Sequence, residues 1–401
     1  MSKTSTDDFF NIVGRITQFI QDTGEGRYTC FKTQKVLLDT TVSDILSYDD
    51  KSASHSKKST FAETDDRRVH TVRISDRLIA SKLAIFSYFL DGSRHVYKID
   101  DIAIGKNIFP FLAGQIIVGC CERVDRDIFK KYSIRHQLVL SLPINFNTDD
   151  DPNFCSYFLK GLNEDISKLR YVQERRLKFN NLLLYKTDGG DPSESDKDKF
   201  KSRAISVIQS EMTDDEQRLV ADLCAKNLLD DEHFLLKDGS IEYNPRFSNL
   251  SDAEWQLMRS NFQHVVGVSK SFDPDLIPNF EGHRLSRTIC ELKPFERTKV
   301  YRYKSEHSDR EFAIWYLRIR NSAFRETNFS DVVKCEMVIS NEGDFISTAL
   351  IDTISANIIR EAYPVCYGKD TRWSNHLYPI YLTETFCKAN YINSDIFINL
   401  F

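Results

Sequence analysis

The sequence predicts an α/β protein in which a mixed β-sheet is flanked by helices. Short apolar and aromatic runs typical of strands come first, and strand patterns then alternate with helical patterns. This order is typical of a mixed sheet covered by helices. With 401 residues, of which 41% are hydrophobic and 28% charged, the chain is long enough for one large domain or two smaller ones.

The first element expected is an amphipathic helix over residues 7–22. Its apolar residues recur at helical spacing, and Gly24 and Gly26 end it. The helix either packs on the core of its own chain or docks on a partner protein. Residues 1–78, which also include a polar loop at 48–69, are therefore a candidate partner-docking region.

Residues 79–401 are expected to form the main domain, with a helical insertion at about 150–205. Within the insertion, a long helix over 154–185 precedes a polar loop over 187–203. The patterns also predict helices at 213–228 and 346–362. Strands are expected at 84–90, at 108–121 (one or two strands), and at 233–237, 264–270, 299–304, 311–320 and 332–340.

Several classes of protein are disfavoured. There is no apolar run of about 18 residues, so we expect a cytoplasmic protein without a membrane segment. The nine cysteines contain no Cys-x-x-Cys pair, which predicts reduced thiols and no zinc site. No Walker A loop is present, so any ATP motor belongs to a partner. The net charge of −5 disfavours a free-standing nucleic-acid binder but allows a nuclease that receives DNA from a partner.

The tripeptide Asp-Gly-Ser occurs twice, at 91–93 and 238–240, each time directly after an apolar strand candidate. Asp-Gly after a strand is also the commonest signal for a hairpin turn. The first copy fits a turn, because residues 94–100 have the pattern of a return strand. Two copies in matching contexts favour a functional role for Asp91 and Asp238.

Two such aspartates form a metal site if their strands are neighbours in one sheet. Carboxylates ~4 Å apart repel by roughly 4 kcal/mol at an effective dielectric constant of about 20, so one is protonated or a cation lies between them. Oxygen ligands without Cys or His favour Mg²⁺ or Mn²⁺. Two such ions can stabilise the attacking and leaving oxygens of phosphodiester hydrolysis. The glycine after each aspartate is expected to leave room for a phosphate backbone.

A third carboxylate is expected from the helix at 213–228. Thr213 can cap this helix, and Glu216 follows it at capping-box spacing, which gives Glu216 a structural alternative to a catalytic role. Asp222 lies on a different face of the helix. Glu216 is the preferred residue and Asp222 the reserve.

The order of these motifs resembles the NurA family of nucleases. After the second Asp-Gly-Ser come Val-Gly-Val-Ser-Lys at 266–270, Trp-Tyr-Leu-Arg at 315–318 and Tyr-Pro at 378–379, and the resemblance runs from about residue 82 to the C-terminus. It implies an RNase H-like fold and a deoxyribonuclease that uses Mn²⁺ (or Mg²⁺). It also implies a homodimer and a HerA-type hexameric ATPase as partner, in DNA end processing or anti-phage defence.

The resemblance also implies roles for individual residues. Asp91, Asp238 and Glu216 would hold the metal. Lys270 stands where the family often has a basic residue near the site, and Tyr378 matches the tyrosine of the Tyr-Pro motif.

One position departs from the family pattern. The family commonly has a histidine about two helical turns after that tyrosine, and Phe386 stands there in this chain. Glu384, Lys388 and His376 are candidates for the role of the missing histidine. Glu384 and Lys388 also have the i,i+4 spacing of an ordinary surface ion pair.

Two other functions are compatible with the sequence. The first is a catalytically inactive NurA-like subunit with a structural role in a translocase complex, which the missing histidine favours. The second is an unrelated α/β binding protein in which both Asp-Gly-Ser segments are ordinary turns. Carboxylate-dependent Mn²⁺ binding would separate both from an active nuclease.

Overall fold

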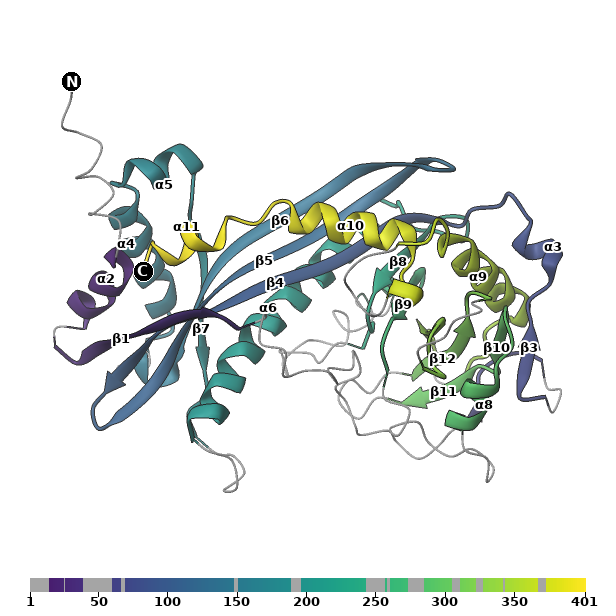
Figure 1. The fold of residues 1–401 in the computed structure, drawn as a ribbon, viewed down its shortest axis with the longest axis horizontal. Coiled ribbons are helices and arrows are strands. Elements are labelled where there is room, and N and C mark those ends of the chain that lie inside the picture. Colours follow the sequence, from purple (N-terminus) through teal and green to yellow (C-terminus); the bar gives the residue numbers. More distant parts are fainter. Residues whose placement is uncertain are drawn as a thin grey trace.

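A computed structural model of the chain shows a mixed β-sheet flanked by helices (Figure 1), which confirms the predicted fold class. Among the described residues the sheet has 13 strands, and both parallel and antiparallel pairs occur in it. The structure describes residues 14–24, 26–38, 60–65, 69–147, 151–188, 196–242, 257, 260–272, 285–304, 311–321, 327–341, 343–366 and 373–401.

The strands lie in the sheet in the order β2-β11-β12-β13-β9-β8-β4-β5-β6-β7, while β1 pairs with β4, and β10 pairs with β12 and β3. Their bounds are β1 (Tyr28–Leu37), β2 (Thr60–Phe61), β3 (Thr71–Arg73), β4 (Phe86–Ile104), β5 (Asn107–Asp125), β6 (Ile128–Pro143), β7 (Phe179–Tyr185), β8 (Phe234–Asp238), β9 (Val265–Ser269), β10 (Glu296–Thr298), β11 (Tyr301–Lys304), β12 (Glu311–Arg318) and β13 (Val332–Val338).

The longest helix, α6, and the penultimate helix, α10, cover opposite faces of β5. A Cβ at Gly114 would meet Ile208 of α6, whereas a Cβ at Gly119 would meet Cys387 of α10, and residues five apart on a strand face opposite sides. The helices are α2 (Arg15–Thr23), α3 (Asp76–Ile79), α4 (Phe154–Ile166), α5 (Arg170–Arg175), α6 (Asp196–Ala225), α8 (Leu285–Glu291), α9 (Thr348–Glu361), α10 (Tyr378–Lys388) and α11 (Ser394–Ile398), with short 3₁₀ segments η2 (Ile144–Phe146) and η4 (Trp373–Asn375).

Two clusters of buried apolar side chains hold the helices to the sheet. One surrounds β4, β5 and β6 and includes residues of α2, α4 and α6. The other lies between β8, β9, β12 and β13 and the helix α9. Because side chains alternate along a strand, β4 contributes Leu90 to the first cluster and Phe89 to the second.

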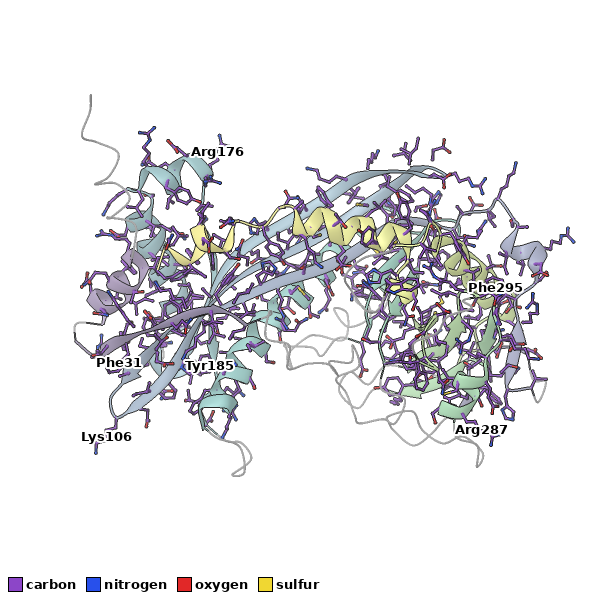
Figure 2. All side chains as sticks on the ribbon, viewed as in Figure 1. Phe31, Lys106, Arg176, Tyr185, Arg287 and Phe295 are labelled. Carbon is purple, nitrogen blue, oxygen red and sulfur yellow. The ribbon has the colours of Figure 1, made fainter. Side chains whose placement is uncertain are left out.

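The predicted long helix over 154–185 is wrong. The segment forms α4 and α5 and then the strand β7, which pairs in parallel with β6. Arg176, labelled in Figure 2, ends α5 with a left-handed backbone (φ 51°). Part of the expected loop at 187–203 is also wrong, because α6 begins at Asp196. The apolar run at 108–121 is one strand, β5, and not two.

The described part of the N-terminal helix packs on the chain's own core. In α2, Ile16 and Ile20 are fully buried within the first apolar cluster, and the ring of Phe19 lies 5.4 Å from that of Phe158. Arg15 forms an ion pair with Asp165 of α4. The apolar stripe is therefore not an exposed docking face over Arg15–Thr23, and residues 7–13 of the predicted helix lie outside the described residues.

We expect Ile20→Ala to lower the free energy of unfolding by about 2–5 kcal/mol, because it removes a fully buried side chain and leaves a cavity. Urea denaturation monitored by circular dichroism measures this change. Gln18→Ala, on the exposed side of α2, is the control and should change the free energy by less than about 0.5 kcal/mol. An Ile20→Ala protein as stable as the parent would show that α2 is not part of the core.

A buried ionic network fixes residues 60–65 against the sheet. Arg297, which is fully buried, binds Glu63 (2.9 Å) and Asp352 of α9 (2.8 Å). Glu63 also accepts a hydrogen bond from the backbone of Val300 and lies 3.6 Å from Lys299. Arg297 and Glu63 thus connect residues 60–65 with the strands β10 and β11 and with the helix α9.

Within the described part of the chain, no helix has the length and apolar character needed to cross a membrane.

Candidate functional site

The two aspartates of the repeated tripeptide lie level with each other on neighbouring strands. β4 and β8 are parallel, and Leu90 pairs with Lys237, so the next residues along the two strands are Asp91 and Asp238. The carboxyl of Asp91 is within electrostatic reach of that of Asp238. The expectation that the two carboxylates converge is therefore met by the pairing of strands that are about 150 residues apart in sequence.

The first Asp-Gly-Ser is not a hairpin turn. β4 runs without interruption through Asp91, Gly92 and Ser93, which pair with Gly119, Val118 and Ile117 of β5. Asp91 is consequently an interior residue of a strand and not a strand-end residue. The second copy does turn: Gly239 follows the end of β8 with φ 78°, a value that glycine adopts without strain.

Helix α6 brings Glu216 to the face of β4 that is opposite to the side chain of Asp91. A Cβ at Gly92 would collide with the carboxylate of Glu216, so the space beside Gly92 holds that carboxylate and not a phosphate backbone as predicted. Glu216 forms an ion pair with Lys237 of β8 at 3.1 Å, and both side chains are buried. Thr213 does not cap a helix: it lies inside α6 and donates a hydrogen bond to the carbonyl of Gln209.

Lys270, which directly follows β9, joins the strand carboxylates to α10. Its ammonium lies 3.0 Å from Asp238 and 3.4 Å from Glu384 of α10. Glu384 also binds Lys388 at 2.5 Å, the ion pair expected from their spacing. Lys388 is more than half exposed, so solvent screens this second pair.

Asp91 is the least compensated carboxylate of the cluster. It is 5% exposed, and among the described residues no cationic nitrogen lies within 4.0 Å of it, whereas Glu216 and Asp238 each have one and Glu384 has two from lysines. Burial raises the pKa of Asp91 well above its ordinary value, and the negative charge of Asp238 raises it further, against the opposing effect of Lys270. Asp91 is therefore the carboxyl of the cluster whose ionised form is least stabilised by neighbouring cations.

The other ionisable groups have shifted pKa values with identifiable causes. Burial raises the pKa of Glu216, and Lys237 opposes that shift. For Glu384 burial also favours the neutral form, but Lys270 and Lys388 outweigh it and lower the pKa to about 2. Burial favours the neutral form of Lys270 as well, yet Asp238, Glu384 and Asp91 raise the pKa of its ammonium above the ordinary value.

Asn375 holds the backbone of Lys270 in place. The side-chain amide of this buried residue in η4 donates to the carbonyl oxygens of Lys270 (2.7 Å) and Val332 (3.0 Å), and its oxygen accepts from the backbone N–H of Asp331 (2.8 Å). Three segments that meet at the site are thus fixed by one side chain, which sequence analysis did not identify.

Three other candidates lie at the edge of the cluster or away from it. Asp222 is 55% exposed and pairs with Arg135, so it is not part of the site. Tyr378 begins α10 and packs its ring against Phe129 (6.2 Å between centroids). His376 is buried, with Nδ1 4.0 Å from Glu384, so it adjoins the cluster through that carboxylate.

The residues fit a divalent cation in donor type. Four carboxyl groups (Asp91, Glu216, Asp238 and Glu384) and two buried ammonium groups (Lys237 and Lys270) make up the cluster. Within the described ranges, however, no three Asp, Glu, His or Cys side chains are already arranged around a metal position.

Comparisons with known proteins leave the family of the chain open. No protein-family model matches it, and no curated protein matches it in sequence. Among solved structures, the chain is similar to the NurA nuclease from Sulfolobus solfataricus, with 10% sequence identity and a TM-score of 0.37 over 96% of this chain and 89% of that one. A likeness at this level establishes neither family membership nor activity.

Lys237 is a second site residue that sequence analysis missed. Its one signal is a lysine inside an otherwise apolar strand run, at a position next to Asp238. Lysine is almost never fully buried unless it is paired. A buried strand lysine therefore indicates a carboxylate partner, but only the fold shows that the partner is Glu216 of α6.

Proposed function

We propose that the chain is a metal-dependent deoxyribonuclease whose active site is the cluster around Asp91 and Asp238. The observation that carries the proposal is the buried, uncompensated carboxylate of Asp91 beside a second carboxylate on the neighbouring strand. A charge arrangement of this kind is costly for a folded protein. It persists at functional sites, where a bound ligand balances it.

In this proposal Asp91 and Asp238 would hold Mn²⁺ or Mg²⁺ on the face of the sheet that α10 covers. Glu216, which lies on the other face in an ion pair with Lys237, would join them by leaving that pair. The ion, when bound, would supply Lewis-acid stabilisation of the phosphodiester and a bound water of lowered pKa. Lys270 places a fixed positive charge beside Asp238, where it can stabilise the anionic phosphoryl group. With a pKa of about 2, Glu384 is a weak proton acceptor at neutral pH, so its role is to hold the Lys270 ammonium.

The proposal includes DNA as substrate, a homodimer and a HerA-type ATPase as partner. Its support is the resemblance of the motifs, together with a net charge of −5, which predicts weak binding of free DNA and hence delivery by another protein. Co-purification of the chain with such an ATPase, and a molar mass measured by light scattering, test these two associations.

The third carboxylate gives a test of the site with a built-in control. We expect Glu216→Gln to reduce Mn²⁺-dependent cleavage of single-stranded DNA by roughly a hundredfold, because Glu216 lies within electrostatic reach of Asp91 and Asp238. Asp222→Asn, on the exposed side of the same helix, should cleave like the parent. The opposite ranking would remove Glu216 from the site. A parent protein without cleavage or Mn²⁺ binding would favour the inactive structural subunit.

A further inference from the structure

We propose that Glu336 of β13 is a positioning residue for Asp238, because it fixes the turn that directly follows this aspartate. The inference rests on the proposed function, in which Asp238 holds the metal ion, and it names the groups that set the place of this ligand. Glu336 lies two strands away from Asp238, since β9 runs between β8 and β13. It acts on Asp238 through Ser240 and Ile241.

The turn after Asp238 folds back over the neighbouring strand β9. The backbone N–H of Gly239 donates to the carbonyl oxygen of Val268 at 2.9 Å. A Cβ at Gly267 would lie 2.9 Å from the carbonyl oxygen of Gly239 and 2.8 Å from the side chain of Ile241. Contacts this short to a Cβ are steric clashes, so glycine at position 267 leaves the room that the turn needs to cross β9.

Glu336 binds the turn where it has crossed β9. The strand register places Glu336 directly opposite Gly267, and paired residues of neighbouring strands lie on the same face of a sheet. One carboxylate oxygen of Glu336 accepts hydrogen bonds from the hydroxyl of Ser240 (2.7 Å) and from the backbone N–H of Ile241 (3.0 Å). The hydroxyl of Ser240 also accepts from the backbone N–H of Glu242 (3.1 Å), so it links the carboxylate to the far end of the turn.

Glu336 binds the turn as a charged group. It is 2% exposed, and its other carboxylate oxygen lies 2.6 Å from the ammonium of Lys334, which is also buried. Burial favours the neutral form of Glu336, but Lys334 and the hydrogen bonds from Ser240 and Ile241 outweigh this effect and lower the pKa. Hydrogen bonds to an ionised acceptor are roughly twice as strong as neutral ones. The turn is therefore held more firmly than a neutral acceptor would hold it.

Lys237 binds the same turn from the other side. Its ammonium donates to the carbonyl oxygens of Asp238 (2.7 Å) and Ser240 (3.1 Å). Lys237, Gly267 and Glu336 lie in one row across β8, β9 and β13. The turn thus lies above the glycine, between a lysine that binds its carbonyl groups and a glutamate that binds its donors. Groups that orient a metal ligand in this way contribute about 10–100-fold to metal affinity.

Isothermal titration of the EDTA-treated full chain with MnCl₂ tests the inference. We expect Ser240→Ala, which removes the hydroxyl that Glu336 binds, to weaken Mn²⁺ binding roughly tenfold. Ser240→Thr keeps a hydroxyl at this position and should bind Mn²⁺ like the parent protein. Ser141→Ala is the matched control, because it removes a buried serine hydroxyl that donates to the carbonyl oxygen of Ala204 in α6. It should leave the Mn²⁺ affinity unchanged.

A second variant removes the acceptor without leaving a lone buried charge. Replacing both members of a buried ion pair by apolar residues is often neutral for stability. Glu336→Leu with Lys334→Met should therefore fold, which circular dichroism checks, and should weaken Mn²⁺ binding by a similar factor. The same replacement of another buried pair, Glu361→Leu with Arg123→Met, is its control and should bind like the parent.

The outcomes separate this inference from the proposed function. Parental Mn²⁺ affinity in a folded Ser240→Ala protein, or in the folded variant without Glu336 and Lys334, would overturn the positioning role and leave the nuclease proposal intact. Equally weakened binding in Ser240→Thr and Ser141→Ala would also overturn it, because the loss would then reflect general damage to packing. No Mn²⁺ binding by the parent protein would instead overturn the proposed function and this inference with it.

Discussion

Asp91→Asn should abolish cleavage and at the same time make the protein harder to unfold. Cleavage of single-stranded DNA with Mn²⁺ should fall by roughly a thousandfold, equivalent to about 4 kcal/mol of transition-state stabilisation. Without metal, burial disfavours the ionised form of Asp91 and raises its pKa, so keeping this carboxyl buried at neutral pH costs free energy whether it is ionised or protonated. Replacing it with a neutral isostere should therefore raise the free energy of unfolding by about 1–3 kcal/mol. Urea denaturation in EDTA measures the second effect.

The opposite signs of the two effects identify Asp91 as a functional residue and not a structural one, because function is often retained at a cost in stability. Asp100 is a control on the same strand: it is buried and accepts a hydrogen bond from the backbone of Thr33. Asp100→Asn should cleave like the parent. Near-parental cleavage by a folded Asp91→Asn protein would remove the proposed active site.

Arg297→Met should destabilise the protein strongly and leave the proposed active site untouched. It leaves Glu63 buried with Lys299, 3.6 Å away, as its remaining cationic neighbour, and breaking a buried ion pair from one side costs about 3–5 kcal/mol. The midpoint of urea unfolding should fall accordingly. The protein that remains folded should keep its cleavage rate, since the network lies around β10, β11 and α9 and not at Asp91.

Two comparisons make this result specific. Adding Glu63→Gln to Arg297→Met should recover part of the lost stability, because the buried carboxylate that has lost its arginine is then neutral. Arg287→Met removes an exposed i,i+4 pair with Glu291 on α8 (Figure 2), and should change stability by less than about 0.5 kcal/mol. Equal effects of Arg297→Met and Arg287→Met would show that the buried network contributes little.

The strands that carry the site could be predicted because their local pattern is strong. β8, β9, β12, β13 and the helix α9 all lie close to the expected ranges. β6 could not be recognised, because its first half, from Ile128 to Gln137, alternates charged, polar and apolar residues without a clear period. The apolar run of β7 was assigned to a helix because a short buried strand and a buried helix segment have the same local appearance.

The site itself was partly predictable from repetition. Asp91 and Asp238 were identified because the same tripeptide follows two strand candidates, but the contact between them depends on the parallel pairing of β4 with β8. Asn375 has no sequence signal, since its function depends on backbone groups of Lys270 and Asp331 that come from distant segments. In each case the sequence does not show which distant segments of the chain lie side by side.

The sharing of strands between the two apolar clusters has a consequence for how the molecule unfolds. β4, β8 and β9 each place neighbouring residues in different clusters, as Leu235 and Leu236 do. Neither cluster can melt without releasing side chains of the other, so we expect the described core to unfold in one cooperative transition. Asp91 and Asp238 lie on these shared strands, and partly unfolded forms that keep the carboxylate cluster intact should therefore be scarcely populated.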